Sequence, residues 1–121
     1  MSLREIANVE RPFVRAARRL GYLALKFVTP GVKGSPDRIV LKGIERATKM
    51  YMLAAGPMSH KRAEHDMREL LAMCIEFVEL KAPGKEAEAH QWRYHANLRQ
   101  LGFKVTVIDS PAGVEEWTHE A

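Results

Sequence analysis

IEFVELK, residues 75–81, is the segment from which the architecture of this 121-residue chain can be worked out. It is rich in residues that favour β-strands and stops at Ala82-Pro83-Gly84, so it predicts a strand that ends near residue 81. Side chains alternate along a strand, which places Glu79 and Lys81 on the same face. Apolar residues on both faces indicate an interior strand that is covered on both sides. A buried acid and a buried lysine need partners, such as each other, a metal or water.

A second segment, GSPDRIVL at residues 34–41, supplies a candidate partner for that strand. Gly34 permits unusual backbone angles and Pro36 fixes its own φ, while residues 38–42 predict a short strand. Asp37 therefore lies at the entrance of a strand. If this strand pairs with residues 75–81, Asp37 and Glu79 converge on one cation.

Two carboxylates and a lysine in this arrangement suit phosphodiester hydrolysis. Carboxylate oxygens bind hard cations such as Mg²⁺ or Mn²⁺, and such an ion polarises a phosphate and lowers the pKa of a bound water. Lys81 would orient that water or neutralise the developing charge, and the backbone carbonyl of Leu80 would add an oxygen ligand. Taken singly, a Pro-Asp pair is usually turn chemistry, and a Glu-x-Lys on a strand is usually a solvated ion pair.

The order of these motifs resembles the VRR-Nuc family of the PD-(D/E)xK nuclease superfamily. The resemblance is carried by Glu10, Gly34-Ser35-Pro36-Asp37, Glu79-Leu80-Lys81 and Gln91, and it is interrupted between about residues 43 and 74. It implies that Asp37 and Glu79 bind metal and that Lys81 is the catalytic lysine. It further implies that Glu10 assists the metal site, directly or through water, and that Gln91 lines the site.

The same resemblance sets expectations for cofactor and partners. It implies dependence on Mg²⁺ or Mn²⁺ and a DNA substrate, which is branched if the chain follows the small stand-alone phage-type members. Those members resemble Holliday-junction resolvases and act as homodimers. A homodimer is therefore expected here too.

Helical periodicity places Glu10 and Gln91 on inward helix faces, independently of the resemblance, but each residue also has a purely structural interpretation. Glu10 continues the apolar face of a first helix, yet it also suits a cap on a helix with Pro12 in its first turn. Gln91 is the polar member of one face of a helix over residues 86–101, and its alternative role is a buried amide satisfied by backbone groups. The other expected members of these two faces are Phe13, Ala17 and Leu20 in the first helix and Ala87, Tyr94, Leu98 and Leu101 in the second.

Positive charge is concentrated in the first part of the chain. Residues 1–50 contain 11 Lys and Arg against 4 Asp and Glu, a net +7, whereas residues 51–121 contain 8 against 11, a net −3. Arg11, Arg15 and Arg18 share a helical face opposite the apolar stripe, with Arg19 beside it. Such a stripe suits the phosphate backbone of DNA, and its alternative is an ordinary solvated helix face.

Composition limits the class of protein. The length predicts a single domain over residues 1–121, and the absence of a long apolar run or signal-peptide pattern predicts a protein of the cytoplasm, the host's if phage-encoded, with no membrane partner. Cys74 is the sole cysteine, which excludes an intrachain disulfide and gives no zinc pattern. His60, His65, His90 and His95 are interpreted as surface or packing residues.

The predicted fold is α/β, a restriction-endonuclease-like sandwich with a small mixed sheet flanked by helices. We expect helices at about 3–21, 59–74 and 86–101, strands at 22–29, 38–42, 75–81 and 104–108, and a final helix from Ser110-Pro111. Residues 43–58 are expected to be irregular. Because more than 30 residues separate Leu41 from Ile75, the connection does not itself enforce a hairpin between the two acidic strands.

The insertion between these strands, residues 43–74, is rich in methionine and ends in an amphipathic helix that Ser59 can cap. The expected apolar face of that helix consists of Ala63, Met67, Leu70, Leu71 and Cys74. Our hypothesis is that the insertion builds or enlarges a dimer interface. The alternative is that it covers the sheet as an extra core layer.

The function that these features favour is metal-dependent, structure-selective DNA endonuclease activity of the Holliday-junction-resolvase type. The alternative is a non-catalytic DNA-binding or assembly protein that keeps the nuclease fold. The complete set of two acids and a lysine argues against that alternative, because a binding module has no reason to bury such groups. A small phosphorylated substrate is disfavoured because no glycine-rich phosphate loop is present in the sequence.

Overall fold

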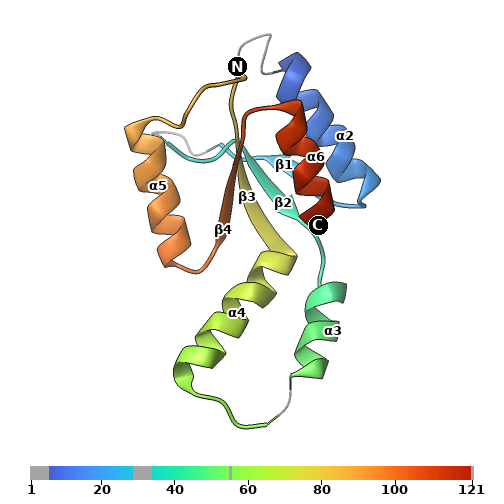
Figure 1. Ribbon diagram of the computed structural model, residues 1–121, viewed down its shortest axis with the longest axis vertical. Coiled ribbons are helices and arrows are strands. Elements are labelled where there is room, and N and C mark those ends of the chain that lie inside the picture. The colour runs from blue at the N-terminus through green and yellow to red at the C-terminus, as the bar shows by residue number, and fades with distance from the viewer. Residues whose placement is uncertain (1–5, 29–33, 55, 121) are drawn as a thin grey trace.

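A mixed β-sheet forms the centre of the computed structural model, which describes residues 6–28, 34–54 and 56–120 (Figure 1). Within these residues the sheet has four strands in the order β1 (Leu23–Lys26), β2 (Arg38–Leu41), β3 (Ile75–Leu80) and β4 (Lys104–Ile108). The pairs β1–β2 and β2–β3 are antiparallel, and β3–β4 is parallel. The small mixed sheet and the interior position of β3 are therefore confirmed.

Helices cover both faces of this sheet. Figure 1 shows α5 (Ala89–Gln100) on one side, and α2 (Arg11–Arg19) with α6 (Pro111–Glu120) on the other. The first helix is divided, because a π-helical turn η1 (Ile6–Glu10) precedes α2 and Pro12 lies in the first turn of α2. The beginning of the helix expected at residues 3–21 lies outside the described residues. None of the described helices is long and apolar enough to cross a bilayer.

Alternation along β3 divides the core into two layers. Val78 and Leu80 face α2 and α6, where Phe13 packs on Trp117 with ring centres 4.7 Å apart. On the face towards α5, the Phe77 ring lies 5.5 Å from that of Phe27 and 5.5 Å from that of Phe103. Full burial of a large apolar side chain contributes roughly 1.5–3 kcal/mol, which applies to Phe13 and Leu80, whereas Phe27 and Phe103 are half-buried; β3 is thus packed from both sides.

The insertion forms a helical arm that extends away from the sheet (Figure 1). This α3–α4 arm consists of α3 (Glu45–Leu53) and α4 (His60–Cys74). The start of α4 is confirmed, because Ser59 Oγ accepts a hydrogen bond from Arg62 N at 3.1 Å. Neither helix contains a fully buried residue, so the arm does not form an extra core layer over the sheet.

The expectation of an irregular segment at residues 43–58 was wrong, since α3 occupies most of it. The helix lacks a side-chain cap at Ile44, and it buries none of its residues. A helix without a cap or a buried stripe has no strong sequence signature, because both signals arise from contacts that it does not make.

Lys42 closes the base of the arm and neutralises a buried carboxylate. Its backbone N–H donates to Cys74 O at 2.8 Å, and its ammonium donates to Ala72 O at 3.0 Å and lies 2.7 Å from Glu76 Oε1. The Glu76 side chain is fully buried and also accepts hydrogen bonds from Trp117 Nε1, at 3.1 Å to each oxygen, and from Thr106 Oγ1. This cluster connects the arm, the sheet and α6.

We predict that Lys42→Met lowers the free energy of unfolding by about 3 kcal/mol, because it leaves the buried Glu76 carboxylate without its closest cation. Chemical denaturation followed by circular dichroism measures this change. The matched control is Lys49→Met, which removes a lysine from an exposed pair with Glu45 and should change stability by less than about 1 kcal/mol. Equal losses from the two variants would show that burial of the Lys42–Glu76 pair is unimportant.

Candidate active site

The register of β2 and β3 brings the two predicted acids together. Arg38 lies opposite Val78, so Asp37, one residue earlier, lies opposite Glu79 on the face towards α5. The backbone N–H of Leu80 donates to Asp37 Oδ2 at 2.6 Å, which fixes the Asp37 carboxylate beside the end of β3. The two strands therefore pair despite the long connection between them, and this pairing brings Asp37 close to the end of β3 that carries Glu79.

The end of β3 also directs a backbone oxygen towards Asp37. Lys81 N donates to Ile108 O at 2.9 Å, on the β4 side. No cis peptide bond occurs among the described residues, and in a trans peptide the C=O points opposite to the N–H. The Leu80 carbonyl is therefore directed away from β4, to the side on which the Asp37 carboxylate lies.

These oxygens fit a hard divalent cation. Two carboxylates and a carbonyl form an oxygen-only donor set, which is the type that Mg²⁺ and Mn²⁺ prefer. Over residues 6–28, 34–54 and 56–120, no group of three or more His, Cys, Asp or Glu side chains could hold a metal ion. The candidate site therefore relies on two side chains and the main chain.

His95 is a candidate site residue that the sequence motifs do not identify. Its side chain is fully buried, and Nε2 lies 3.4 Å from Oε1 of Glu79, which is itself 2% exposed. The interpretation of His95 as a surface or packing residue was therefore incomplete. One signal was available, because His95 follows Gln91 by four positions and thus lies on the same face of the helix.

Burial and nearby charged groups shift the pKa of His95. Burial lowers the pKa of His95 below its ordinary value of 6.5, and the positive charges of Arg99 and Lys81 lower it further, whereas the negative charge of Asp37 raises it. The charges of Lys81 and Asp37 thus both affect the pKa of the ring that contacts Glu79. The structure brings Asp37, Glu79 and Lys81 into one neighbourhood under α5.

Gly34 sets the position of the loop that leads to Asp37. Its φ is +93°, in the region that favours glycine, and a Cβ atom there would lie 2.4 Å from the backbone oxygen of His90. The loop therefore packs directly on the first turn of α5. This close approach joins the strand that carries Asp37 to the helix that carries His95.

Glu10 forms an ion pair with Arg38, on the face of the sheet opposite to the Asp37 side chain. Its Oε1 lies 2.5 Å from a guanidinium nitrogen of Arg38, and the same guanidinium donates to Ala24 O at 3.0 Å. Arg38 and Asp37 are neighbours at the start of a strand, so their side chains leave on opposite faces. The structure thus joins Glu10 to the residue next to Asp37 rather than to Asp37 itself.

Gln91 makes a backbone contact at the start of α5. Its Oε1 accepts a hydrogen bond from Glu88 N at 2.8 Å, which caps the helix. This matches the alternative role of an amide satisfied by the backbone. The predicted membership of the inward face around Gln91 was partly wrong. Leu101, an expected member, is 73% exposed, whereas His95, which was not among the expected members, is fully buried.

The basic stripe lies on the solvent side of α2. Arg11, Arg15, Arg18 and Arg19 are exposed, whereas Phe13, Ala16 and Ala17 are buried. The predicted division of this helix into an apolar and a basic face is confirmed. Leu20 is an exception, because it is 37% exposed rather than part of the buried stripe.

Comparisons with known proteins bear on the fold and the family. The chain is 35% identical over 103 residues to "Putative nuclease p44" of Acyrthosiphon pisum secondary endosymbiont phage 1, a match that covers 85% of this chain and 81% of that protein. Its fold is similar to a solved "VRR_NUC domain" structure with a TM-score of 0.67 and 22% identity, over 98% of this chain and 97% of the other. No protein-family model matches the chain.

We predict that His95 makes the metal-free protein less stable as the pH falls. Below pH 6.5 the unfolded chain binds a proton at this histidine, whereas the folded protein, in which the pKa is lowered, does not. The free energy of unfolding should then decrease by up to about 1.4 kcal/mol per pH unit until the folded pKa is reached. Denaturation in EDTA between pH 7 and pH 5, compared with His95→Gln, measures this contribution, and parallel curves for the two proteins would contradict it.

Proposed function

Because the chain belongs to the VRR-Nuc family of nucleases, we propose that it is a divalent-metal-dependent DNA endonuclease whose active site contains Asp37, Glu79 and Lys81. The observation that carries this proposal is the pairing of β2 with β3. It sets Asp37 opposite Glu79, with the Leu80 N–H donating to Asp37 Oδ2 at 2.6 Å.

In this proposal, Asp37, Glu79 and the Leu80 carbonyl would hold Mg²⁺ or Mn²⁺, which would supply Lewis-acid polarisation of the phosphate when bound. Lys81 contributes a positive charge at the end of β3, where it stabilises the charge that develops on the phosphate or orients the attacking water. Asp37 and Glu79 orient their oxygens from a rigid sheet, which limits the reorganisation needed when the substrate binds.

Glu10 and Gln91 have supporting roles in the same proposal. Glu10 holds Arg38, the neighbour of Asp37, through a pair at 2.5 Å. Gln91 caps the helix that carries His95, through its contact with Glu88 N at 2.8 Å. Both residues thus maintain the elements that position the acids, which is a less direct role than ligation of the metal.

The arginine stripe on α2 provides the path for the DNA backbone. Its members are Arg11, Arg15, Arg18 and Arg19, all of which are exposed. The sequence of α2 places no acidic side chain among them. Phosphate contacts from such a surface release counterions, so binding should weaken steeply with salt.

We further propose that the enzyme is a homodimer that acts on branched DNA, with the α3–α4 arm as the interface. The arm exposes large apolar side chains, including Tyr51 at 69%, Met52 at 77%, Leu53 at 80% and Met67 at 61%. A hollow of about 480 Å³ between the two helices has room for side chains of a second copy. Residues 45–74 also carry 5 Lys and Arg against 4 Asp and Glu, a balance that suits a protein partner better than DNA.

Activity is tested by incubating the protein with Mg²⁺, Mn²⁺ or EDTA on four-way junctions, flaps, duplex and single-stranded DNA. We expect metal-dependent cleavage that Asp37→Asn, Glu79→Gln and Lys81→Met each reduce by at least about 100-fold, because each removes a group that acts on the phosphate or the ion. Paired cuts in opposite strands of a junction would support two active sites related by a two-fold axis.

The control is Glu116→Gln, which removes an exposed carboxylate on α6, across the sheet from the site, and should leave cleavage unchanged. Absence of metal-dependent cleavage of every substrate, or full activity of Asp37→Asn, would refute catalysis. DNA binding without cleavage would instead support a non-catalytic protein with the nuclease fold.

The dimer is tested by making the arm polar with Met52→Ser, Leu53→Ser and Met67→Gln together. Analytical ultracentrifugation should show the wild-type protein at twice its chain mass of 13.7 kDa and the variant at the chain mass, since the apolar contacts are lost. Leu101→Ser is the control, because Leu101 is equally apolar and 73% exposed but lies outside the arm. A folded arm variant that stays dimeric would exclude this interface.

A further inference from the structure

We infer that His95 is a positioning residue that holds the Glu79 carboxylate in the orientation needed to bind the cation. The inference rests on the proposed function, because it treats Glu79 as a ligand. The observation behind it is the contact between two buried side chains, with His95 Nε2 3.4 Å from Glu79 Oε1 and side-chain exposures of 0% and 2%. Neither the sequence motifs nor the resemblance assigns a role to this histidine.

The surroundings of His95 restrict its ring. The residue lies on α5, and its ring packs edge-on against that of Trp92 with centres 6.1 Å apart and planes at 66°. Gly34 brings the loop before Asp37 against the first turn of the same helix. The imidazole is thus presented to Glu79 from a fixed direction, which is what a residue that orients another side chain requires.

The contact also selects one tautomer. A proton on Nε2 allows the ring to donate to the carboxylate, whereas a lone pair on Nε2 would face another lone pair and repel it. Nδ1 is buried and has no hydrogen-bond partner among the described residues. An apolar side chain would fill this space without leaving a buried nitrogen unpaired, so packing alone explains His95 poorly.

Donation from His95 affects the cation through Glu79. A hydrogen bond to Oε1 fixes the rotation of the carboxylate about its terminal bond, and the ligand is oriented before the ion arrives. Partners that orient metal ligands in this way typically contribute about 10–100-fold to metal affinity. The expected role of His95 is therefore in metal binding, without contact with the DNA or the ion.

The test compares His95→Leu, which removes the donor, with His95→Gln, whose amide nitrogen is the same number of bonds from Cβ as Nε2. Binding of Mn²⁺ to the protein in the absence of DNA is measured by electron paramagnetic resonance, together with the Mn²⁺ concentration that gives half-maximal cleavage. We expect His95→Leu to weaken Mn²⁺ binding by about 10-fold or more and His95→Gln to stay close to the wild type. At saturating Mn²⁺, kcat should be nearly restored in His95→Leu.

His119→Gln is the matched control, because His119 is 75% exposed on α6 and should not affect Mn²⁺ binding. Unchanged Mn²⁺ binding by folded His95→Leu would overturn the inference, and so would an equal loss in His95→Gln, which would indicate packing. The proposed function fails separately: if the wild type binds Mn²⁺ through Glu79 but cleaves no DNA, the positioning role of His95 stands and the endonuclease proposal does not.

Discussion

Pairing of β2 with β3 is the constraint on which the rest of the structure depends. The register that sets Arg38 opposite Val78 also determines which residues reach the end of the two strands, and Asp37 is held there by the Leu80 N–H at 2.6 Å. A slip of one residue would turn every side chain of one strand to the other face, so the apolar layers on the two sides of the sheet and the acidic pair depend on the same register. Packing of the core therefore maintains the geometry of the site.

Two buried carboxylates on β3 illustrate how environment separates a structural acid from a candidate functional one. Glu76 has the Lys42 ammonium at 2.7 Å and three further donors or cations nearby, so its charge is compensated in place. Glu79, on the opposite face, contacts His95, a ring whose lowered pKa disfavours the charged form. The first acid is held by groups of β4 and α6 together with Lys42, whereas the second contacts α5 and precedes Leu80, whose N–H donates to Asp37.

Much of this could be predicted from local patterns. Alternation oriented Glu79 with Lys81, and turn residues placed Asp37 at the start of a strand, because both signals depend on neighbours in sequence. The partners of Glu10 and Gln91 could not be predicted, since Arg38 and Glu88 N meet them only after folding. His95 was missed because its position four residues after Gln91 indicates a shared helix face but not that the imidazole is buried against Glu79, and α3 was missed because it has neither a cap nor a buried stripe.

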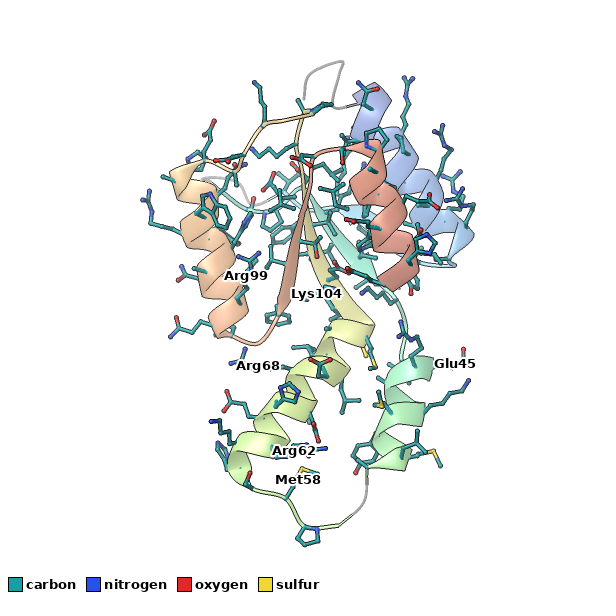
Figure 2. All side chains as sticks on the ribbon, in the orientation of Figure 1. Glu45, Met58, Arg62, Arg68, Arg99 and Lys104 are labelled. Carbon is teal, nitrogen blue, oxygen red and sulfur yellow. The ribbon has the colours of Figure 1, made fainter. Side chains whose placement is uncertain are left out.

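The α3–α4 arm joins the ends of β2 and β3 that lie farthest from Asp37 and Lys81. Its base is fastened where Lys42 N donates to Cys74 O at 2.8 Å. The arm also contacts the helix that carries His95, because the Arg68 guanidinium on α4 donates to Arg99 O at 2.8 Å at the end of α5 (Figure 2). The pairs from Leu41–Ile75 to Arg38–Val78 lie between the arm and the acids, so a change of length or of partner at the tip of the arm is transmitted to them through the paired strands and through the contact of Arg68 with α5.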